Sequence, residues 1–429
     1  MNIFILIFGK LISFLSGALN LGNGSTWPGH IALSLNPNFI SNILGGSEAK
    51  IVFITGTNGK TTTAKLTKTI LEKNGKSVFI NKSGANLLNG IASSLILEAS
   101  YSGKINKDFA IFEIDENALT VISENIQPNF LIALNLFRDQ LDRYGEVDTI
   151  SKNWKNVYEK LKNKTTFILN ADDPRIAYLG IDKDFRTHYF GLNDLTLKSK
   201  YPYQAADSIL CPKCNAKLNY DPLYYSHLGN WSCPNCKLKR PRLELSKVNF
   251  SPLYGVYNKY NLLAAYLLAQ ENGIEIKNIE NALNDFKPAF GRQEEILIEN
   301  KRIKFFLAKN PTSFNESLRT INELGAKNLL IILNDRIPDG RDISWIWDID
   351  FEALLNSKIN ITVSGDRAYD MALRLSYVEN NKNFITYVDL KESIDKALAG
   401  TKDNEILYIL PTYSAMLDTR KLLTGKKIL

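Results

Sequence analysis

The sequence predicts an α/β protein with two doubly wound, mostly parallel sheets that follow one another along the chain. Short apolar runs alternate with helical patterns from residue 51 to near the end, which is typical of parallel sheets covered by helices. The first apolar run leads into a Gly-rich turn and a helix, a common start of a phosphate-binding domain. Two Cys-x-x-Cys pairs interrupt the alternation near its middle, and they predict a small metal-bound insertion.

Composition narrows the class of protein. The 429 residues are 45% hydrophobic and 23% charged, as in soluble globular proteins, and a chain of this length should hold two or three domains. The net charge of +7 suits anionic partners such as nucleotides, phosphorylated substrates or a membrane surface, but no long Lys/Arg block indicates nucleic acid. The four cysteines all belong to the two pairs, which favours a metal and a reducing, cytoplasmic compartment over disulfides.

Residues 1–45 are expected to form an apolar helix followed by a turn-rich segment. Met1 to Leu19 is strongly apolar, and residues 22–29 are rich in Gly, Asn, Ser and Pro. A signal peptide or a membrane span would also be apolar, but Lys10 interrupts the run and no basic residue precedes it. We favour an amphipathic helix that packs on the body of the protein or touches the inner face of the cell membrane.

The clearest functional signal is the turn between an apolar strand at residues 51–54 and a helix expected to run to about Asn74, with Gly75 as its stop. In such turns, glycine N–H groups and the helix N-terminus hold phosphate, the lysine reaches the β- and γ-phosphates, and the hydroxyl binds Mg²⁺. Ile54 stands where the general pattern has its first glycine, so this loop is a variant, and a chance Gly-rich turn is the alternative. The residues expected to contact a nucleotide are Gly56, Thr57, Asn58, Gly59, Lys60, Thr61 and Thr62.

The remaining strands of the first sheet are expected at residues 78–80, 109–112, 130–134 and 167–169. Ligands of doubly wound sheets bind at the carboxyl ends of the strands, so the polar residues there are candidates. Glu113 follows the second of these strands and is expected to be the second Mg²⁺ ligand, beside Thr61. Asp115 and Glu116 are either part of the same site or solvated loop charges.

Two polar segments follow the later strands. Residues 135–145 read Asn-Leu-Phe-Arg-Asp-Gln-Leu-Asp-Arg-Tyr-Gly, and residues 170–174 read Asn-Ala-Asp-Asp-Pro. Both lie where a ligand of the sheet would bind. The ordinary alternatives are a charged helix start for the first segment and an Asx turn for the second.

The four cysteines predict a structural Zn²⁺ site in an insertion at about residues 205–245. Each Cys-x-x-Cys knuckle presents two thiolates, and two knuckles close a tetrahedral site that leaves no position open for water. Short strands of polar and aromatic residues are expected between the pairs, as in a zinc ribbon, with His227 on the surface rather than at the metal. The expected ligands are Cys211, Cys214, Cys233 and Cys236.

Residues 296–429 alternate again and predict a second, Rossmann-like α/β domain, with strands at 303–307, 329–333, 359–363 and 406–410. After the second of these strands, the segment Ser344-Trp345-Ile346-Trp347-Asp348 places two tryptophans beside carboxylates. Exposed aromatic residues beside acids indicate a protein interface. A helix start with buried tryptophans is the alternative.

The Gly-Thr-Asn-Gly-Lys-Thr loop and the segments after it resemble, in residue type and in order, the Mur ligases and their folylpolyglutamate synthetase relatives. Those enzymes phosphorylate a carboxylate with ATP and then let an amine attack the acyl phosphate. The resemblance implies an ATP-binding domain over residues 46–295 and a C-terminal, partner-binding ligase domain over residues 296–429. In the first domain Lys60, Thr61, Glu113 and Mg²⁺ would align the γ-phosphate with the carboxylate.

The same resemblance implies roles for residues further along. Asn261, near the start of a helix that ends near Glu271, would read the adenine edge, and Arg292 would reach the γ-phosphate from the seam between the domains. Lys309, in an Ala-Lys-Asn-Pro turn, would face the acyl phosphate, with a surface lysine as the alternative. Gln140 replaces a histidine of the family and would touch a metal only as an amide or through water.

Within this family the chain resembles the MurT proteins, the Mur-ligase-like subunits of lipid II isoglutaminyl synthase. Only about 45 residues precede the first predicted strand, where most Mur ligases carry a UDP-binding domain, and a Cys₄ ribbon lies inside the ATP-binding domain. The segments 137–145 and 344–348 add to the resemblance. The implied reaction is ATP-dependent amidation of the D-glutamate α-carboxylate in the lipid II stem peptide to D-isoglutamine, a step of peptidoglycan synthesis.

The resemblance also implies a partner, a GatD-like glutamine amidotransferase that forms a heterodimer with this chain and supplies ammonia. The partner brings a cysteine and a histidine, and an aspartate of this chain would complete the triad by orienting the imidazole. By position that aspartate is Asp348, with Asp350 as the second choice.

Two other functions stay open from the sequence. One is a ligase that adds an amino acid to a folate or to a muramyl peptide. The other is a nucleotide-gated protein that binds nucleic acid through its ribbon, which would show as steeply salt-dependent binding. Basic side chains that favour this second function flank the later cysteine pair at Lys237, Lys239, Arg240 and Arg242.

Overall fold

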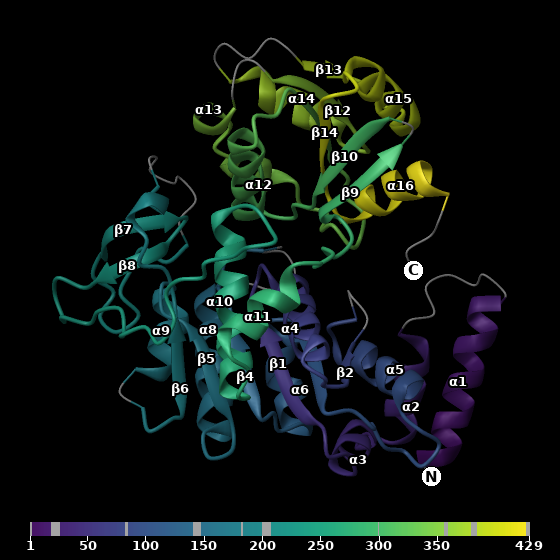
Figure 1. Cartoon of the computed structure of the whole chain (residues 1–429), viewed down its shortest axis with the longest axis vertical. Helices are drawn as coiled ribbons and strands as arrows, with labels where there is room; N and C mark the ends of the chain where they lie inside the picture. The colour runs from purple at the N-terminus through teal and green to yellow at the C-terminus, as the bar shows by residue number, and fades with distance from the viewer. Residues whose placement is uncertain are drawn as a thin grey trace.

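The computed structural model of the chain describes residues 2–18, 26–81, 85–139, 147–181, 183–199, 207–298, 300–355, 359–378 and 384–425. Its strands form two six-stranded sheets and a two-stranded ribbon. Figure 1 shows the two sheets in separate lobes, with the ribbon at one side of the lower lobe and helix α1 (Asn2–Ala18) at the other. The candidate site lies where the two lobes meet.

The first sheet is doubly wound and parallel throughout, in the order β2-β3-β1-β4-β5-β6. All five strands predicted for it are present. The sequence did not predict β6, an edge strand in which only the last two residues are buried, so its apolar signal is short. The strands are β1 (Lys50–Thr55), β2 (Val78–Ile80), β3 (Phe109–Ile114), β4 (Phe130–Ala133), β5 (Thr166–Asn170) and β6 (Thr187–Phe190).

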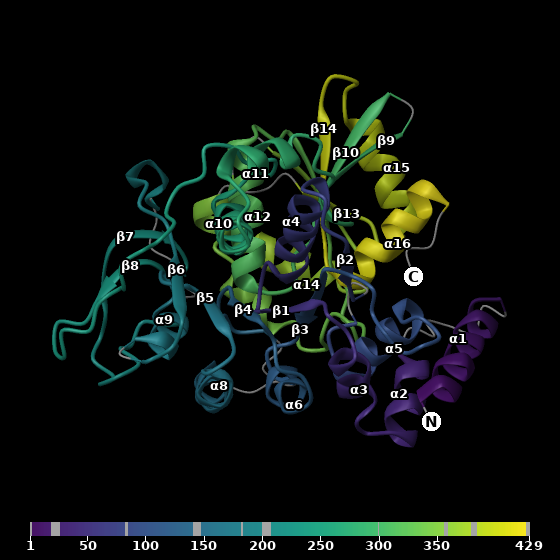
Figure 2. The same cartoon turned by 60° about the horizontal axis from the view of Figure 1, so that its bottom comes forward.

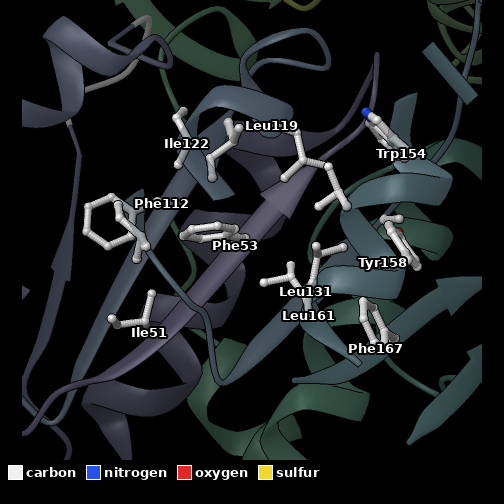
Figure 3. Packing of buried hydrophobic residues seen from close by; sticks show 14 of the residues in the cluster. Ile51, Phe53, Phe112, Leu119, Ile122, Leu131, Trp154, Tyr158, Leu161 and Phe167 are labelled. Atoms are coloured by element: carbon white, nitrogen blue, oxygen red, sulfur yellow. The ribbon is translucent and has the colours of Figure 1, made fainter. Parts of the chain in front are cut away.

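Helices cover both faces of this sheet. In β1, Phe53 belongs to the core on one face, whereas Val52 and Ile54 belong to the core on the other, as expected for a strand buried on both sides. Figure 3 shows the first core, where the rings of Phe53 and Phe112 lie edge to face with centroids 6.2 Å apart. The helices of the first face are α2 (Trp27–Leu35), α3 (Phe39–Gly45), α5 (Leu88–Glu98), α6 (Ala118–Asn125), α8 (Val147–Leu161) and α9 (Pro174–Gly180). Those of the second face are α4 (Lys60–Lys73), α10 (Val256–Glu271) and α11 (Ile276–Leu283).

The second sheet has the order β13-β12-β11-β14-β10-β9 and is parallel except for β9, which runs antiparallel to β10. The four strands predicted for it are present as β10, β11, β12 and β14. The sequence did not predict β9, which begins with a charged run, or β13, which is three residues long. The strands are β9 (Arg292–Ile298), β10 (Lys301–Phe306), β11 (Asn328–Ile332), β12 (Asn360–Ser364), β13 (Phe384–Thr386) and β14 (Ile406–Pro411). The helices of this lobe are α12 (Pro311–Glu323), α13 (Phe351–Leu354), α14 (Ala368–Ser376), α15 (Leu390–Gly400) and α16 (Tyr413–Thr424).

The ribbon follows β6 and consists of the antiparallel strands β7 (Asn219–Tyr225) and β8 (Leu228–Ser232), which lie between the two cysteine pairs as predicted. Trp231 of β8 is buried, and its Nε1 donates to the Ala171 carbonyl at 2.8 Å, which fastens the ribbon to the end of β5. Figures 1 and 2 both show the ribbon beside β6, at the opposite end of the sheet from α1.

Helix α1 lies against α2 and α5 and buries Ile5 and Leu6 there. Among the described residues, every helix falls short of the combination of length and apolarity that a bilayer crossing would need.

Candidate active site

The loop predicted to bind phosphate joins β1 to α4 at the carboxyl edge of the first sheet. Helix α4 begins at Lys60 and ends at Lys73, and Gly75 has a φ of 77°, so the predicted helix and its stop are confirmed. Gly59 has a φ of 95°, a region that favours glycine. A Cβ on Gly59 would lie 2.1 Å from Asn261 Oδ1, so the close approach of the loop to α10 requires a residue without a side chain.

The side chain of Lys60 turns back into the loop. Its Nζ donates to the Gly56 carbonyl at 2.5 Å and to Glu116 Oε2 at 2.8 Å. Burial raises the pKa of the Glu116 carboxyl, but the ammonium groups of Lys60 and Lys309 together lower it to about 2. Asp115 and Glu116 are each 7% exposed, so their interpretation as solvated loop charges is wrong. The reason is that their loop turns inward across the sheet edge.

The structure brings together Thr61 and Glu113, the two residues predicted to hold Mg²⁺. Thr61 Oγ1 donates to Glu113 Oε2 at 2.6 Å. They meet because β1 and β3 pair in parallel, with Ile54 opposite Glu113, and α4 starts just beyond β1. Burial raises the pKa of Glu113, although Thr61 and the nearby Arg292 oppose that shift. A buried carboxylate beside a hydroxyl is a donor set that hard divalent cations favour, so these residues fit Mg²⁺.

A cleft between the two lobes adjoins the loop and contains about 700 Å³ of space, part of it open solvent. Asn261 accepts from Thr63 Oγ1 at 3.3 Å and donates to Asn258 Oδ1 at 3.0 Å, which orients its amide in the cleft wall. Arg292 enters the cleft from the start of β9 in the other lobe. The residues that border the cleft are Asn58, Gly59, Thr62, Tyr225, Tyr257, Asn258, Asn261, Arg292, Gln293, Phe306, Leu307, Lys309, Thr312, Ser313, Glu316 and Ser317.

Lys309 reaches from the second lobe to the first. Its Nζ forms an ion pair with Asp139, whose side chain is 7% exposed. Burial raises the pKa of the Asp139 carboxyl despite this pairing. Burial lowers the pKa of Lys309, but the carboxylates of Asp139 and Glu116 reverse that shift and raise it. Next to it, Asn310 Nδ2 lies 3.3 Å from Asn58 Oδ1 across the cleft. Lys309 therefore borders the cleft and does not stand alone on the surface.

Comparison with known proteins covers nearly the whole chain. Residues 54–269 match the Mur ligase middle domain, and residues 307–416 match the MurT ligase C-terminal domain. The MurT subunit of lipid II isoglutaminyl synthase (glutamine-hydrolyzing) from Streptococcus pneumoniae (strain ATCC BAA-255 / R6) is 34% identical over an alignment that covers 95% of this chain and 94% of that protein. The chain belongs to the MurT family. The MurT subunit from Staphylococcus aureus (strain COL) is likewise 34% identical, over 92% of this chain and 91% of its own.

Solved structures outside the MurT family share its fold. A pseudomurein peptide ligase type C from Methanothermus fervidus superposes with a TM-score of 0.66 at 23% identity, over 88% of this chain and 79% of that one. The MurF ligase from Thermotoga maritima, in complex with ADP, superposes with a TM-score of 0.63 at 14% identity, over 91% of this chain and 83% of that one. At such identities the likeness concerns the fold alone, and it confirms the predicted Mur-ligase architecture.

In this MurT-family chain, the aspartate predicted to serve the partner lies at the surface. Asp348 ends a 3₁₀ helix (Ser344–Asp348), its side chain is 47% exposed, and its Oδ2 is 3.6 Å from Arg138 Nη2. Asp350 is 7% exposed and accepts from Asn315 Nδ2 at 2.9 Å. Of the two aspartates, Asp348 is the one that a second protein can reach.

Asp348 also borders a second pocket, which it shares with Lys309 and Asp139. Beside this pocket, Trp347 is 47% exposed and lies edge to face with Tyr377, with ring centroids 5.3 Å apart. Trp345 is half-buried, because its ring packs against Phe314 at 6.0 Å. The expected exposed aromatic surface is therefore formed by Trp347, whereas Trp345 follows the alternative of a tryptophan packed inward. The pocket is lined by Arg138, Asp139, Lys309, Asn310, Pro311, Asp342, Ser344, Trp345 and Asp348.

The four cysteines of the MurT-family ribbon converge on one point. Cys211 Sγ lies 3.6 Å from Cys236 Sγ, and Cys214 Sγ lies 3.5 Å from Cys233 Sγ. All four sulfur atoms lie within 4.8 Å of one another. A tetrahedron with Zn–S bonds of about 2.3 Å separates its sulfurs by about 3.8 Å, so the donor set fits Zn²⁺.

His227 is buried, so the expectation of a surface position is wrong. It is 1% exposed, its Nε2 lies 3.3 Å from Asp173 Oδ2, and its ring lies 4.8 Å from that of Phe137. The turn between β7 and β8 points inward because Asp173, which also accepts from Leu136 N at 2.8 Å, offers the ring a buried partner. The ribbon thereby supports the segment at residues 135–139.

Some residues of the site gave no sequence signal. Tyr225 of the ribbon and Glu316 of α12 both border the cleft, and the pairing of Asp139 with Lys309 joins two lobes. These residues come from elements far apart in the sequence, so no local pattern relates them. The Asn-Ala-Asp-Asp-Pro segment was a candidate from the sequence, and it does adjoin the site. Asp172 contacts Tyr260 of α10, and Asp173 contacts His227 of the ribbon. Gln140 lies outside the described residues.

Proposed function

We propose that this chain is the ligase subunit of a glutamine-hydrolysing lipid II isoglutaminyl synthase. It uses ATP to convert the α-carboxylate of D-glutamate in the lipid II stem peptide to the amide of D-isoglutamine. The observation that carries the proposal is that the group formed by Lys60, Thr61 and Glu113 adjoins a cleft lined by Arg292 and Lys309 of the other lobe. Arg292 is close enough to Glu113, and Lys309 to Glu116, to shift the pKa of each carboxyl. Similarity to MurT subunits over 95% of the chain supports the choice of substrate.

ATP binds with its phosphates on the loop at residues 56–62 and its base beside Asn261. The N–H groups of the loop and the N-terminus of α4 hold the phosphates. Lys60 exchanges its contact with Glu116 for one with the β- and γ-phosphates, and Arg292 meets the γ-phosphate from the second lobe. Binding thus draws the two lobes onto the same anion.

Mg²⁺, held by Thr61 and Glu113, would neutralise charge on the transferred phosphoryl group. The phosphoryl group passes from ATP to an oxygen of the α-carboxylate, which gives an acyl phosphate and ADP. Lys309, at the edge of the cleft, reduces the repulsion between these two anions. Ammonia then attacks the acyl carbon, the bond from that carbon to the phosphate oxygen breaks, and loss of a proton from nitrogen leaves the amide.

The ammonia comes from a glutamine amidotransferase subunit that forms a heterodimer with this chain. Asp348 orients the catalytic histidine of that partner, because its carboxylate is half exposed whereas Asp350 is held by Asn315. Trp347 and Tyr377 lie exposed beside it and supply the aromatic contacts that interfaces favour. The pocket that Asp348 shares with Lys309 lies between the two reaction centres.

Zn²⁺ on the four cysteines has a structural role, since the thiolates fill a tetrahedral site. We do not propose nucleic-acid binding, because Arg240, one of the basic residues that favoured it, is turned inward to Asp172 at 2.8 Å. The protein works in the cytoplasm, where ATP is available and thiols stay reduced, at the inner face of the membrane that holds its substrate.

Lys60→Ala tests the proposal. In the heterodimer with the amidotransferase, the variant should lose glutamine-dependent amidation of lipid II about a hundredfold or more. Lys68→Ala is the matched control, because Lys68 lies on the exposed face of the same helix, paired with Glu72 at 3.6 Å. The product is followed by mass spectrometry. Amidation at the wild-type rate in Lys60→Ala would overturn the assignment, and a mass gain of a whole amino-acid residue would select the amino-acid ligase instead.

A further inference from the structure

The outward face of α1 is a continuous apolar stripe. Its exposed side chains recur at intervals of three and four residues, which places them on one side of the helix. About half or more of each is exposed: Ile3 52%, Phe4 79%, Ile7 49%, Phe8 52%, Leu11 50% and Phe14 72%. These residues are called the α1 stripe below. It contains no polar or charged side chain.

The opposite face of α1 is held to the body of the protein, so the direction of the stripe is determined. Leu6 is fully buried, and Gly9 lies so close to Ile96 of α5 that a Cβ on it would be 2.9 Å from that side chain. Lys10 Nζ donates to the Ala99 carbonyl at 2.7 Å. The side chain of Lys10, the one charged residue of the helix, therefore points toward the body of the protein, and the stripe faces solvent.

The surface beside the α1 stripe is apolar, and neither α1 nor α2 carries an acid. Leu35, at the end of α2, is 59% exposed and lines a shallow apolar hollow together with residues of the stripe. Trp27, at the other end of α2, is 65% exposed. No Asp or Glu occurs before Glu48. Lys104 lies exposed in a turn whose Gly103 adjoins Leu6.

We propose that the α1 stripe is the face by which this protein docks on a lipid bilayer. The helix lies in the plane of the headgroups with the stripe at the boundary with the acyl chains. Its 17 residues span about 25 Å, and its inner face is packed on α2 and α5, so it lies along the bilayer. The proposal rests on the proposed function in one respect: because the proposed substrate is linked to a lipid, the cleft must work next to a membrane.

The chemistry of the stripe favours lipid over a protein partner. Protein interfaces combine apolar contacts with about one hydrogen bond per 100–200 Å² and a polar rim, whereas the α1 stripe offers hydrocarbon alone. Tryptophan is enriched at membrane interfaces, and Trp27 lies exposed at the start of α2, the helix against which α1 packs. Because α1 and α2 carry no acids, these two helices add no repulsion from anionic headgroups. Figures 1 and 2 show α1 at the outer edge of the lower lobe, where a flat bilayer can approach it.

Flotation of the full-length chain with vesicles tests the docking face, in the absence of ATP and substrate. Wild type should float with vesicles of phosphatidylglycerol and phosphatidylcholine in equal parts, and should still float at high salt because insertion is apolar. The triple variant Phe4→Gln, Phe8→Gln, Leu11→Gln should bind to the vesicles at least about a hundredfold more weakly than wild type. The matched control is Leu195→Gln, Leu297→Gln, Ile337→Gln, which changes three residues of similar exposure (71%, 68% and 70%) that are scattered over the molecule.

Equal flotation of wild type and the stripe variant would overturn the proposal, as would loss of wild-type flotation at high salt. Sedimentation velocity without vesicles provides a second readout: a dimer of wild type that the stripe variant lacks would assign the stripe to a second copy of the chain. In the heterodimer, the stripe variant should amidate lipid II in vesicles more slowly than wild type but lipid II in detergent at an equal rate. If neither protein amidates lipid II, the proposed function fails while the flotation result still decides the docking face.

Discussion

The carboxylate of Asp172 accepts a hydrogen bond from the hydroxyl of Tyr260 at 2.6 Å. Its other oxygen accepts from Arg240 Nη1 at 2.8 Å, and the carboxylate is fully buried. Tyr260 lies on α10 next to Asn261, and Arg240 follows the second cysteine pair of the ribbon. One buried carboxylate therefore connects the ribbon with the wall of the cleft that we assign to the nucleotide.

Arg240→Ala should destabilise the protein by about 3 kcal/mol or more, because it leaves a buried carboxylate without its charged partner. The affinity for ATP should fall with it, since α10 loses its link to the ribbon. Urea unfolding and titration with ATP measure the two effects. Arg242→Ala, at an exposed position of the same segment, is the control and should change neither. Unchanged stability in Arg240→Ala would contradict the structural role assigned to Asp172.

The stability should depend on pH through Asp172. Burial raises the pKa of this carboxyl from 3.8 to about 6, although Arg240 and Tyr260 oppose the shift. The folded state therefore binds the proton more tightly than the unfolded chain. Protonation of Asp172 therefore adds to the free energy of unfolding. This contribution is complete below about pH 4 and is lost as the pH rises through 6.

The reference for that measurement is Asp172→Asn, which cannot titrate. Relative to this variant, the free energy of unfolding of the wild type should fall by on the order of 3 kcal/mol between about pH 4 and 7, given about 1.4 kcal/mol per pKa unit. Urea unfolding over this pH range gives the difference. Curves that run parallel would show that the carboxyl titrates alike in both states.

Cys233→Ser should abolish zinc binding and loosen the ribbon. Wild type should contain about one zinc per chain by elemental analysis, and the variant little or none, because a structural site needs all four ligands. Since the ribbon carries Arg240 and His227, loss of the zinc should displace these residues and thereby also weaken ATP binding. Lys213→Ala, between the cysteines of the first knuckle, is the control. A variant that keeps both its zinc and its ATP affinity would refute this coupling.

Asp348→Asn should separate the two half-reactions. In the heterodimer, hydrolysis of glutamine should fall by up to about 10⁴-fold, as for loss of the third member of a triad. Amidation driven by added ammonium salts should continue, because the ligase cleft is unchanged. Asp350→Asn is the comparison. Because Asp350 is buried against Asn315, this variant should be less stable, while the glutaminase activity of the heterodimer per folded molecule stays near wild type. The reverse outcome would move the triad aspartate to Asp350.

Much of the fold follows from local sequence patterns. Most of the strands that the sequence predicts are buried on both faces, such as β1 with Val52, Phe53 and Ile54, and their apolar runs are unambiguous. The edge strand β2 is only three residues long, but all three of them are apolar, so it was predicted as well. The strands that the sequence missed are β6, β9 and β13. These are edge or short strands, whose side chains face water on at least one side and whose place depends on a neighbour.

The sequence by itself determined the predicted phosphate-binding loop, the carboxylate near the end of β3 and the four thiols, because each is a set of residue types at a spacing that the backbone converts directly into a position. Only the tertiary structure decided that Asp115 and Glu116 are buried, that His227 meets Asp173, that Lys309 pairs with Asp139, and that Asp348 is accessible while Asp350 is not. These contacts join segments that are distant along the chain. Their distances and exposures are set by how the two lobes and the ribbon pack, and packing depends on all the surfaces at once.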